Sequence, residues 1–319
     1  MDLDLRIARY TLHFTAIDTV SLPAYKGSTL RGAFGYALKS VCCSMRQECA
    51  ECLLQSVCLF QMAFGSKIPA DDETFFSSYS EVPRPFIIEP PTDDKLTYYP
   101  GEVLSIGLIL MGQAIDQLPY FIAAFRKMGE NGIGKGRGRL LLTLTLLTDD
   151  AERIVYDGVR FSRCQASFSL KELLEKVWSL YAEWDRTDLT ITIDTPLRLR
   201  EKGHLLTHLD AVDFIKNIVR RSSGLSSFYG RGGLTREMVH SLLELASEIS
   251  TECAELYWYD WNRVSAQNGP MKMGGLKGRV YFRNVPTGLI PWIVAGEILH
   301  VGKGATFGLG KYRITSIEG

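Results

Sequence analysis

The chain of 319 residues is 46% hydrophobic and carries 36 basic against 36 acidic residues, a formal charge of zero. This length and composition are typical of a globular protein with two ordinary domains or one large one, and the zero charge does not favour nucleic acid as a partner. No run of 18 apolar residues occurs, which excludes a transmembrane helix, and the opening "MDLDLRIARY" lacks the apolar core of a signal peptide. We therefore expect a cytoplasmic protein with no membrane partner.

The first half of the chain predicts the order strand, helix, strand, strand, helix, strand. "DLRIARYTLHFTAI" alternates with period two and predicts a strand, and "GSTLRGAFGYALKSV" has helical spacing from a cap near Ser28. A hairpin is predicted between 86 and 112, followed by the helical pattern and strand of "QLPYFIAAFRKMGENGIGKGRGRLLLTLTLL". Residues 149–188 then predict a last strand or two and a charged connecting helix.

Five cysteines fall within seventeen residues directly after the first predicted helix: Cys42, Cys43, Cys49, Cys52 and Cys58. A cytoplasmic protein does not normally use such thiols as disulfides. Cys49 and Cys52 form a CxxC pair, and Cys58 with either Cys42 or Cys43 completes the four ligands of a tetrahedral zinc ion. We expect a structural zinc with no open position for chemistry, and an iron–sulfur cluster is the alternative.

The second half of the chain predicts the same order of elements. The strand "DLTITIDTPLRLR" and the helix "HLDAVDFIKNIVRRSSGLSSFYG" come before a hairpin at 255–286, the helix "LIPWIVAGEILH" and the strand "KYRITSIE". Each half thus predicts βαββαβ, the ferredoxin-like order. We predict an α+β fold of tandem ferredoxin-like (RRM-like) domains, the first with a cysteine-rich insertion at 42–58. The predicted boundaries are 1–165, a connecting helix or linker at 166–187, and 188–319.

A glycine-rich basic loop precedes the last strand of each half. "GENGIGKGRGR" at 129–139 interleaves five glycines with basic residues, and "HVGKGATFGLGKYRI" at 300–314 has four glycines within its basic flanks. Glycine lets a backbone approach a ligand closely, and its N–H groups can bind phosphate oxygens. The candidate phosphate contacts are Lys135, Arg137, Arg139, Gly302, Lys303, Gly304, Gly308, Gly310, Lys311 and Arg313.

Neither loop fits a mononucleotide site. Five residues separate Gly304 from Gly310 where a Walker loop needs four, and Tyr312 occupies the place of the magnesium-binding hydroxyl. Nucleotide loops also run from strand to helix, whereas these run from helix to strand. Two such loops on RRM-like halves predict binding of an RNA backbone. Residues 262–319 carry a local charge of +6, which fits a polyanion partner or a solvated face with its counter-charges elsewhere in the fold.

These segments resemble a known family, the RAMP superfamily of CRISPR-associated proteins. The similarity is greatest to its pre-crRNA-processing endoribonuclease family, in the branch with a C-terminal glycine-rich loop. It rests on "STLRGAFGYALK", the cysteine cluster, "GIGKGRGRL", "LTITIDTPLRLR", "WNRVSAQNGPMKMGGLKGRVYF" and "ILHVGKGATFGLGKYRI". The resemblance implies an enzyme that binds CRISPR repeat RNA and cuts the pre-crRNA once per repeat without a metal. The ribose 2′-OH attacks the adjacent phosphate, leaving a 2′,3′-cyclic phosphate and a 5′-hydroxyl.

Such a cleavage requires a base near the 2′-OH, an acid near the leaving 5′-oxygen and a cation at the phosphate. The family places a catalytic histidine near the first helix, but "KGSTLRGAFGYALKSV" contains none. Tyr36 and Lys39 on this helix and His300 beside the terminal loop are the catalytic candidates, although His300 also fits a residue that interacts with a helix dipole. The missing histidine leaves a non-catalytic RNA-binding subunit of a CRISPR effector complex, with other effector subunits as partners, as the alternative. A third interpretation is a metal-binding structural protein whose glycine loops only pack.

Overall fold

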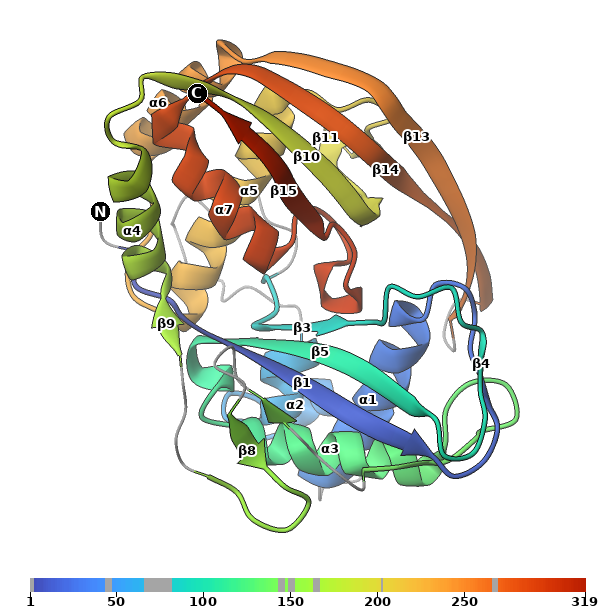
Figure 1. Ribbon diagram of the computed structural model, residues 1–319. Helices are drawn as coiled ribbons and strands as arrows, with labels where there is room; N and C mark the ends of the chain where they lie inside the picture. The colour runs from blue at the N-terminus through green and yellow to red at the C-terminus, as the bar shows by residue number, and fades with distance from the viewer. Residues whose placement is uncertain are drawn as a thin grey trace. The chain divides into compact units, whose positions relative to one another are not determined.

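The computed structural model describes residues 3–43, 48–65, 82–142, 147–148, 153–162, 167–201, 203–265 and 269–319. The chain forms two compact units (Figure 1), and both combine a sheet of antiparallel strands with helices, as the predicted α+β class requires. The N-terminal unit is Arg6–Phe168, and the C-terminal unit joins Ser169–Gly319 with Met1–Leu5. In the described part of the chain, no helix combines the length and apolar character needed to cross a membrane.

The N-terminal unit contains a sheet in the order β3-β5-β1-β7-β8, to which β6 and β9 add by pairing with β1. Strands β2 and β4 form a separate pair. The strands are β1 (Arg6–Ala16), β2 (Val20–Ser21), β3 (Phe86–Glu89), β4 (Thr97–Tyr98), β5 (Val103–Met111), β6 (Leu140–Leu141), β7 (Leu147–Thr148), β8 (Ile154–Tyr156) and β9 (Phe168–Ser169). The helices are α1 (Gly27–Cys42), the short 3₁₀ turn η1 (Cys49–Glu51), α2 (Leu59–Phe64), η3 (Gly112–Ala114) and α3 (Leu118–Asn131).

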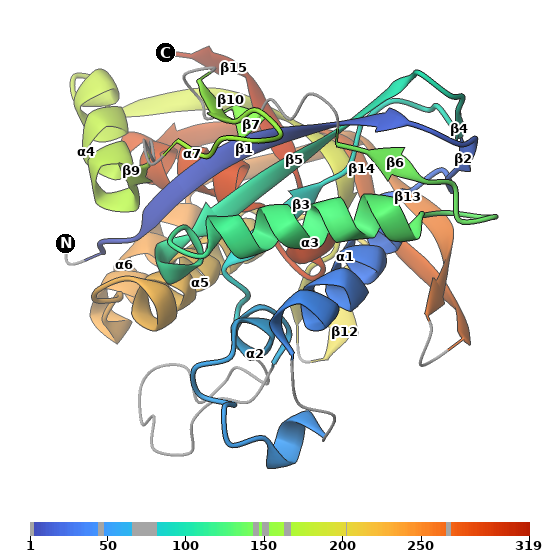
Figure 2. The same cartoon turned by 90° about the horizontal axis from the view of Figure 1, so that it is seen from below.

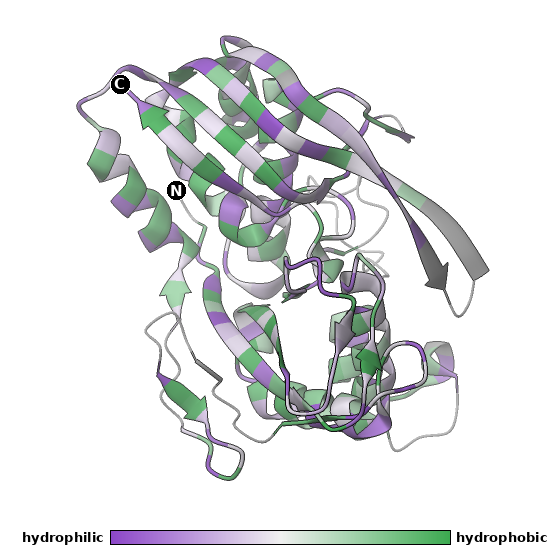
Figure 3. Cartoon of the chain, turned by 45° about the vertical axis from the view of Figure 1, so that its right-hand side comes forward, coloured by the Kyte–Doolittle hydropathy of each residue, from purple (hydrophilic) through white to green (hydrophobic). Residues whose placement is uncertain are grey.

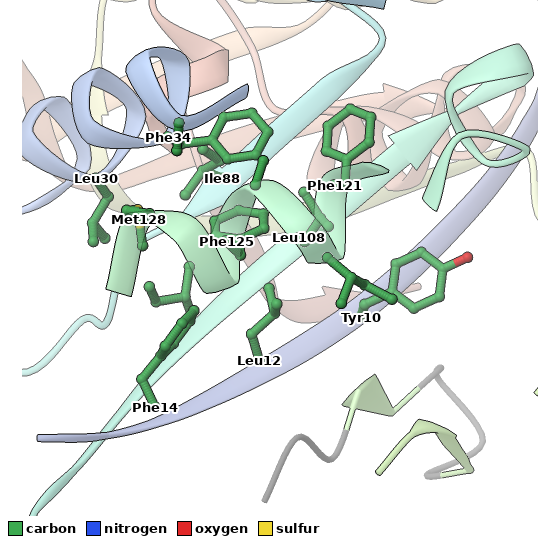
Figure 4. Packing of buried hydrophobic residues seen from close by; sticks show 14 of the residues in the cluster. Tyr10, Leu12, Phe14, Leu30, Phe34, Ile88, Leu108, Phe121, Phe125 and Met128 are labelled. Atoms are coloured by element: carbon green, nitrogen blue, oxygen red, sulfur yellow. The ribbon is translucent and has the colours of Figure 1, made fainter. Parts of the chain in front are cut away.

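Helices α1 and α3 cover one face of the N-terminal sheet, as Figure 2 shows. Strand β1 alternates, so that Tyr10, Leu12 and Phe14 point into the core while the residues between them are partly exposed. Figure 4 shows how Phe34 of α1 meets Phe125 of α3 with ring centroids 4.5 Å apart. This aromatic contact fixes α1, and it leaves the opposite side of that helix exposed. The helix begins after Lys26, which makes no side-chain cap, so the predicted cap near Ser28 is wrong.

The C-terminal unit contains a four-stranded sheet in the order β13-β14-β10-β15 and a small β11-β12 pair. Its strands are β10 (Arg186–Leu197), β11 (Arg200–Glu201), β12 (His204–Leu205), β13 (Ser250–Ser265), β14 (Gly269–Pro286) and β15 (Tyr312–Glu318). Its helices are α4 (Leu170–Tyr181), α5 (Ala211–Tyr229), α6 (Arg236–Ser247), η4 (Thr287–Leu289), α7 (Ile290–Leu299) and η5 (Ala305–Phe307). Phe214 of α5 packs against Phe282 of β14 and Tyr312 of β15, which fixes α5 on this sheet.

The division of the chain differs from the predicted one at two places. Helix α4 was expected within a linker at 166–187, but it packs against α7 and buries Leu170, Leu174 and Val177 in the C-terminal unit. The first residues also belong there, because Leu3 and Leu5 are buried and Asp4 pairs with the backbone of Arg231. Burial of apolar side chains therefore places both segments with a sheet that begins far from residue 1 in the sequence.

Candidate functional site

The terminal loop, residues 300–311, connects α7 to β15. Its four glycines have φ between 68° and 86°, the left-handed region that side chains disfavour. At Gly310 a Cβ atom would lie only 1.8 Å from the Val301 carbonyl oxygen. Glycine is required at this position because the loop closes on its own backbone.

Most backbone amides of the terminal loop already have acceptors within the protein. The Val301 N–H donates to the Gly310 carbonyl (3.0 Å), and the Gly310 N–H donates to Pro196 (3.2 Å). The hydroxyl of Thr195 holds the same loop by donating to the Gly308 carbonyl at 2.7 Å. Gly308 and Gly310, predicted as phosphate contacts, thus have structural roles. The sequence analysis missed Thr195, which lies 113 residues before Gly308 and gives no local signal.

A short run of the terminal loop is available for an anion. Within the described residues, the N–H groups of Gly304, Ala305 and Thr306 have no acceptor. Lys303 directly precedes them, and its side chain is exposed with no ion-pair partner among the described residues. Successive amides beside a cation suit a phosphate oxygen. Phosphate binding by this loop stays a prediction, and Lys303 with Gly304 are its remaining candidates.

His300, a catalytic candidate from the sequence, is fully buried. Its Nδ1 lies 3.1 Å from the Leu309 carbonyl oxygen, so the imidazole joins the two ends of the terminal loop. Its backbone has φ of 56° at the C-cap of α7. A ring in this position cannot reach the 2′-OH of a strand bound at the surface. The structure therefore gives His300 a structural contact inside the terminal loop, and we do not carry this residue into the proposed chemistry.

Much of the basic charge in the last sixty residues is neutralised within the sheet of the C-terminal unit. Arg313 forms a bidentate pair with Asp194 at 2.7 and 2.9 Å, which raises the pKa of its guanidinium. Arg283 pairs with Asp188 at 3.0 Å. Figure 3 shows that hydrophilic and hydrophobic residues alternate along the strands of this sheet. The local charge of +6 therefore has counter-charges in the fold, and Arg313 is a weaker candidate for phosphate than its sequence context implied. Lys311, also predicted, is half-buried and has contacts of its own.

The N-terminal glycine loop, residues 132–139, follows α3 and contacts the β2 strand. Gly134 has φ of 72°, and its Cβ would lie 2.1 Å from the Ser21 carbonyl oxygen, to which the Lys135 N–H donates at 3.0 Å. The side chains of Lys135 and Arg137 are exposed and have no ion-pair partner among the described residues. Arg139 instead pairs with Asp18 at 2.7 Å. Two of the three predicted phosphate contacts in this loop are thus available for an anion.

The two remaining catalytic candidates, Tyr36 and Lys39, lie one turn apart on the exposed side of α1. Tyr36 is 68% exposed. The ammonium of Lys39 lies 5.7 Å from the centroid of the Phe60 ring in α2, which restricts where this cation can point. A phenol and an ammonium at i and i+3 can face one ligand. A hydrogen-bond donor and a cation thus lie one turn apart on α1, and their catalytic role stays a prediction.

A histidine–hydroxyl pair that the sequence analysis missed lies on the N-terminal sheet. His13 of β1 is directly opposite Ser105 of β5, and its Nδ1 lies 2.7 Å from the serine Oγ. Alternation along β1 places His13 on the polar side of the strand, which was the available signal. Its partner lies 92 residues away in the sequence, so only the strand pairing reveals the contact. His13 is partly exposed, unlike His300.

The cysteine segment bridges the end of α1 and the start of α2. Cys42 ends α1, and burial together with the neighbouring thiols of Cys58 and Cys43 raises its pKa to about 11. Cys49 begins the turn η1, and Cys52 is the C-cap residue of that turn. Among the described residues, no three metal-binding side chains converge as a site for one ion. The thiols thus form two sets, and the zinc predicted for them stays a prediction.

An apolar pocket of about 380 Å³ lies in the C-terminal unit between α4, α6 and α7. Trp178, Leu242 and Trp292 line it, and Lys171 with Glu175 stand at its edge. The lining offers few groups for phosphate, so this pocket does not extend the candidate RNA surface.

Two different family models match the two halves of the chain. A family model described as CRISPR-associated endoribonuclease Cas6 matches residues 191–312, which include the terminal loop. This match relates the C-terminal part of the chain to the Cas6 family of CRISPR-associated proteins. A second model, AF_1859_N, described as an N-terminal domain, matches residues 5–166. The resemblance predicted from the sequence is confirmed.

Solved Cas6 structures share this fold at low sequence identity. A Cas6 product complex aligns with a TM-score of 0.58 and 14% identity over 97% of this chain and 98% of that chain. A Thermus thermophilus Cas6 gives 0.52 and 15% over 97% and 98%. A partial Cas6-RT-Cas1–Cas2 complex gives 0.60 and 14% over 98% of this chain but 46% of that chain. None of the curated proteins compared with the chain matches it.

Proposed function

We propose that this chain binds CRISPR repeat RNA and cleaves pre-crRNA by attack of a ribose 2′-OH, with no metal in the chemical step. The observation that carries the proposal is the pair of glycine loops before the last strand of each half. Each loop presents lysine or arginine side chains with no carboxylate partner in the described chain: Lys135 and Arg137 in one, Lys303 in the other. Cations on loops too long for one nucleotide suit the phosphates of a polymer.

The proposed chemistry forms one bond and breaks another at the same phosphorus. The 2′-oxygen loses its proton to a base and bonds to phosphorus, while the bond to the 5′-oxygen breaks and an acid protonates that oxygen. Lys39 would stabilise charge on the phosphate, and Tyr36 would donate to the leaving oxygen. With His300 buried, the proposal rests on Tyr36 and Lys39, which lie one turn apart on α1.

The finer description of the fold is also a proposal. A ferredoxin-like sheet has the strand order second, third, first and last. The path β13-β14-β10-β15 fits this order, and the path β3-β5-β1-β7 fits it in the N-terminal unit, where β8 continues the sheet and β6 and β9 also pair with β1. We assign both units to this class. The RNA partner would be the CRISPR repeat, and binding to other CRISPR subunits stays a prediction that the likeness to a chain of the Cas6-RT-Cas1–Cas2 complex supports only at the level of fold.

The test is to incubate the purified chain with the repeat RNA encoded beside it, with and without EDTA. We expect one cut per repeat that survives EDTA and disappears when the 2′-hydroxyl at the cut site is replaced by hydrogen. The product ends should be a 2′,3′-cyclic phosphate and a 5′-hydroxyl. A cut that needs a divalent metal, or one that tolerates the deoxy substitution, would exclude the mechanism.

The alternative is a non-catalytic RNA-binding subunit, and the absence of a histidine from α1 favours it. It predicts tight, salt-sensitive binding of the same RNA with no product in the same assay. The third interpretation, loops that only pack, predicts no salt-sensitive binding at all.

A further inference from the structure

We propose that Cys42, Cys49, Cys52 and Cys58 bind one zinc ion and that the ion holds residues 48–58 against the ends of α1 and α2. This inference is independent of RNA cleavage. It begins from the separation of the thiols into two sets, one on the helix ends and one on a turn.

The first set is Cys42 and Cys58, and the packing of α1 against α2 positions both residues. Cys42 ends α1 and Cys58 directly precedes α2, and these two helix ends lie near each other, since the Lys39 ammonium of α1 is 5.7 Å from the centroid of the Phe60 ring of α2. Phe34 and Phe64 bring the two helices together, with ring centroids 6.2 Å apart. A Cβ on Gly35 would meet the Phe64 ring at 2.9 Å, so the missing side chain at Gly35 makes room for this ring against α1. Two thiols are therefore preplaced at one end of this helix pair.

The second set lies on a run of turns. The Cys52 N–H donates to Cys49 at 3.4 Å, and the Gln55 N–H donates to Cys52 at 3.0 Å. A CxxC turn of this kind directs two thiolates to one ion. The segment between Cys42 and Cys58 thus carries a second pair of thiols, and each pair can supply two of the four zinc ligands.

Apolar burial does not hold this segment in place. Leu53 is 92% exposed, Val57 is 78% exposed and Leu54 is 50% exposed. Exposed aliphatic side chains do not stabilise a turn, and small segments of this type commonly depend on a metal. Closing the two pairs of thiols on one zinc would supply the missing stabilisation.

Binding would convert four thiols into four thiolates and release four protons, giving a Zn(S-Cys)₄ group with a net charge of −2. No electron is transferred. The affinity should therefore rise with pH, because protons compete with zinc for the sulfurs. Cys43 is the C-cap residue of α1, and we assign the ligand to Cys42 because Cys42, like Leu59 and Phe60 of α2, packs against the N-terminal core.

The first test is elemental analysis of the full-length protein, purified without a metal column and kept reduced. We expect about one zinc per chain. The double variant Cys49→Ser, Cys52→Ser should lose at least about nine-tenths of it. The matched control is Cys253→Ser, because Cys253 is also half-buried but lies on β13 of the other unit, and it should keep the full amount. Cys42→Ser should lose the zinc and Cys43→Ser should keep it.

A second measurement keeps the proposal testable if a variant fails to fold. In the wild-type protein, four thiols should resist a thiol reagent until a zinc chelator is added, and hydrogen exchange at residues 48–65 should then rise at least about tenfold while β10 is unchanged. A reduced protein that takes up no zinc, a double variant that keeps it, or iron with acid-labile sulfide in its place would each overturn the proposal. Loss of zinc in Cys43→Ser with retention in Cys42→Ser would overturn the choice of the fourth ligand.

Discussion

At the scale of the residue, the structure separates glycines that the backbone requires from those that a ligand would use. Gly310 would place a Cβ on the Val301 carbonyl, whereas Gly136 has φ of 86° and open space around it. Both positions have a left-handed backbone conformation, but only at Gly310 is there also no space for a side chain. Position in a glycine-rich motif is therefore a poor guide to the role of each glycine.

Gly310→Ala should lower the free energy of unfolding by more than about 3 kcal/mol, since it adds a clash to the conformational strain. Gly136→Ala, with strain alone, should cost about 1 kcal/mol. Urea unfolding followed by far-ultraviolet circular dichroism measures both. Equal losses in the two variants would show that the close contact at Gly310 relaxes without cost.

Tyr36→Phe and Lys39→Ala should reduce the single-turnover rate of repeat cleavage by about 10²–10⁴-fold, because each removes a group proposed to act in the transition state. RNA affinity should change little. Tyr120→Phe is the control, since this tyrosine is 49% exposed on α3 and has no assigned role. An unchanged rate in both α1 variants would move the catalytic site away from α1.

At the scale of the element, the same loop type presents two kinds of cation. Lys135, Arg137 and Lys303 are exposed and have no carboxylate partner in the described chain. Arg139 pairs with Asp18, which lies between β1 and β2, and Arg313 pairs with Asp194 of β10. Each aspartate precedes its arginine by more than a hundred residues. A phosphate must compete with a carboxylate for the second kind but not for the first.

Replacing Lys135, Arg137 or Lys303 by alanine should reduce the slope of log affinity against log salt by about 0.7–1 for each residue. Arg139→Ala and Arg313→Ala should change the slope less, because their carboxylate partners already neutralise them. Titrations of labelled repeat RNA at several salt concentrations give these slopes. If paired and unpaired cations proved equivalent, the ion pairs would have to open when RNA binds.

At the scale of the whole molecule, carboxylates with lowered pKa values are present in both units. The Arg139 side chain lowers the pKa of Asp18 in the N-terminal unit, and the Asn284 N–H, followed by Arg283, lowers that of Asp188 in the C-terminal unit. The unfolded chain binds protons more readily at these sites, so their contribution is complete above the unfolded pKa of about 4 and is lost as the pH falls through the folded value. We expect acid to destabilise both units.

Asp18→Asn should lower the melting temperature at pH 7, and the difference from the wild type should shrink toward pH 3, where the wild-type carboxyl itself becomes protonated. Melting curves across this pH range test the sign. Asp94→Asn, at an exposed carboxylate with no partner among the described residues, should leave the curve unchanged. A deficit that stays constant with pH would indicate that Asp18 acts through packing and not through charge.

The sequence by itself determined the main strands and helices, the positions of both glycine loops and the resemblance to the family. These properties are local: alternation along β1, helical spacing in α1 and the need for positive φ at Gly302 or Gly134 all depend on neighbouring residues. The tertiary structure alone decided that His300 is buried, that Thr195 holds the terminal loop and that His13 meets Ser105. Each of these contacts joins segments that only strand pairing or loop closure brings together.

The same reason explains the charges and the division into units. From the sequence, the last sixty residues have a basic excess, but folding places Asp188 and Asp194 of β10 beside Arg283 and Arg313. From its sequence, helix α4 looks like a charged linker, but in the structure its apolar side packs against α7. A residue type and its spacing predict which interactions a segment can make, whereas burial and long-range pairing decide which of them it makes.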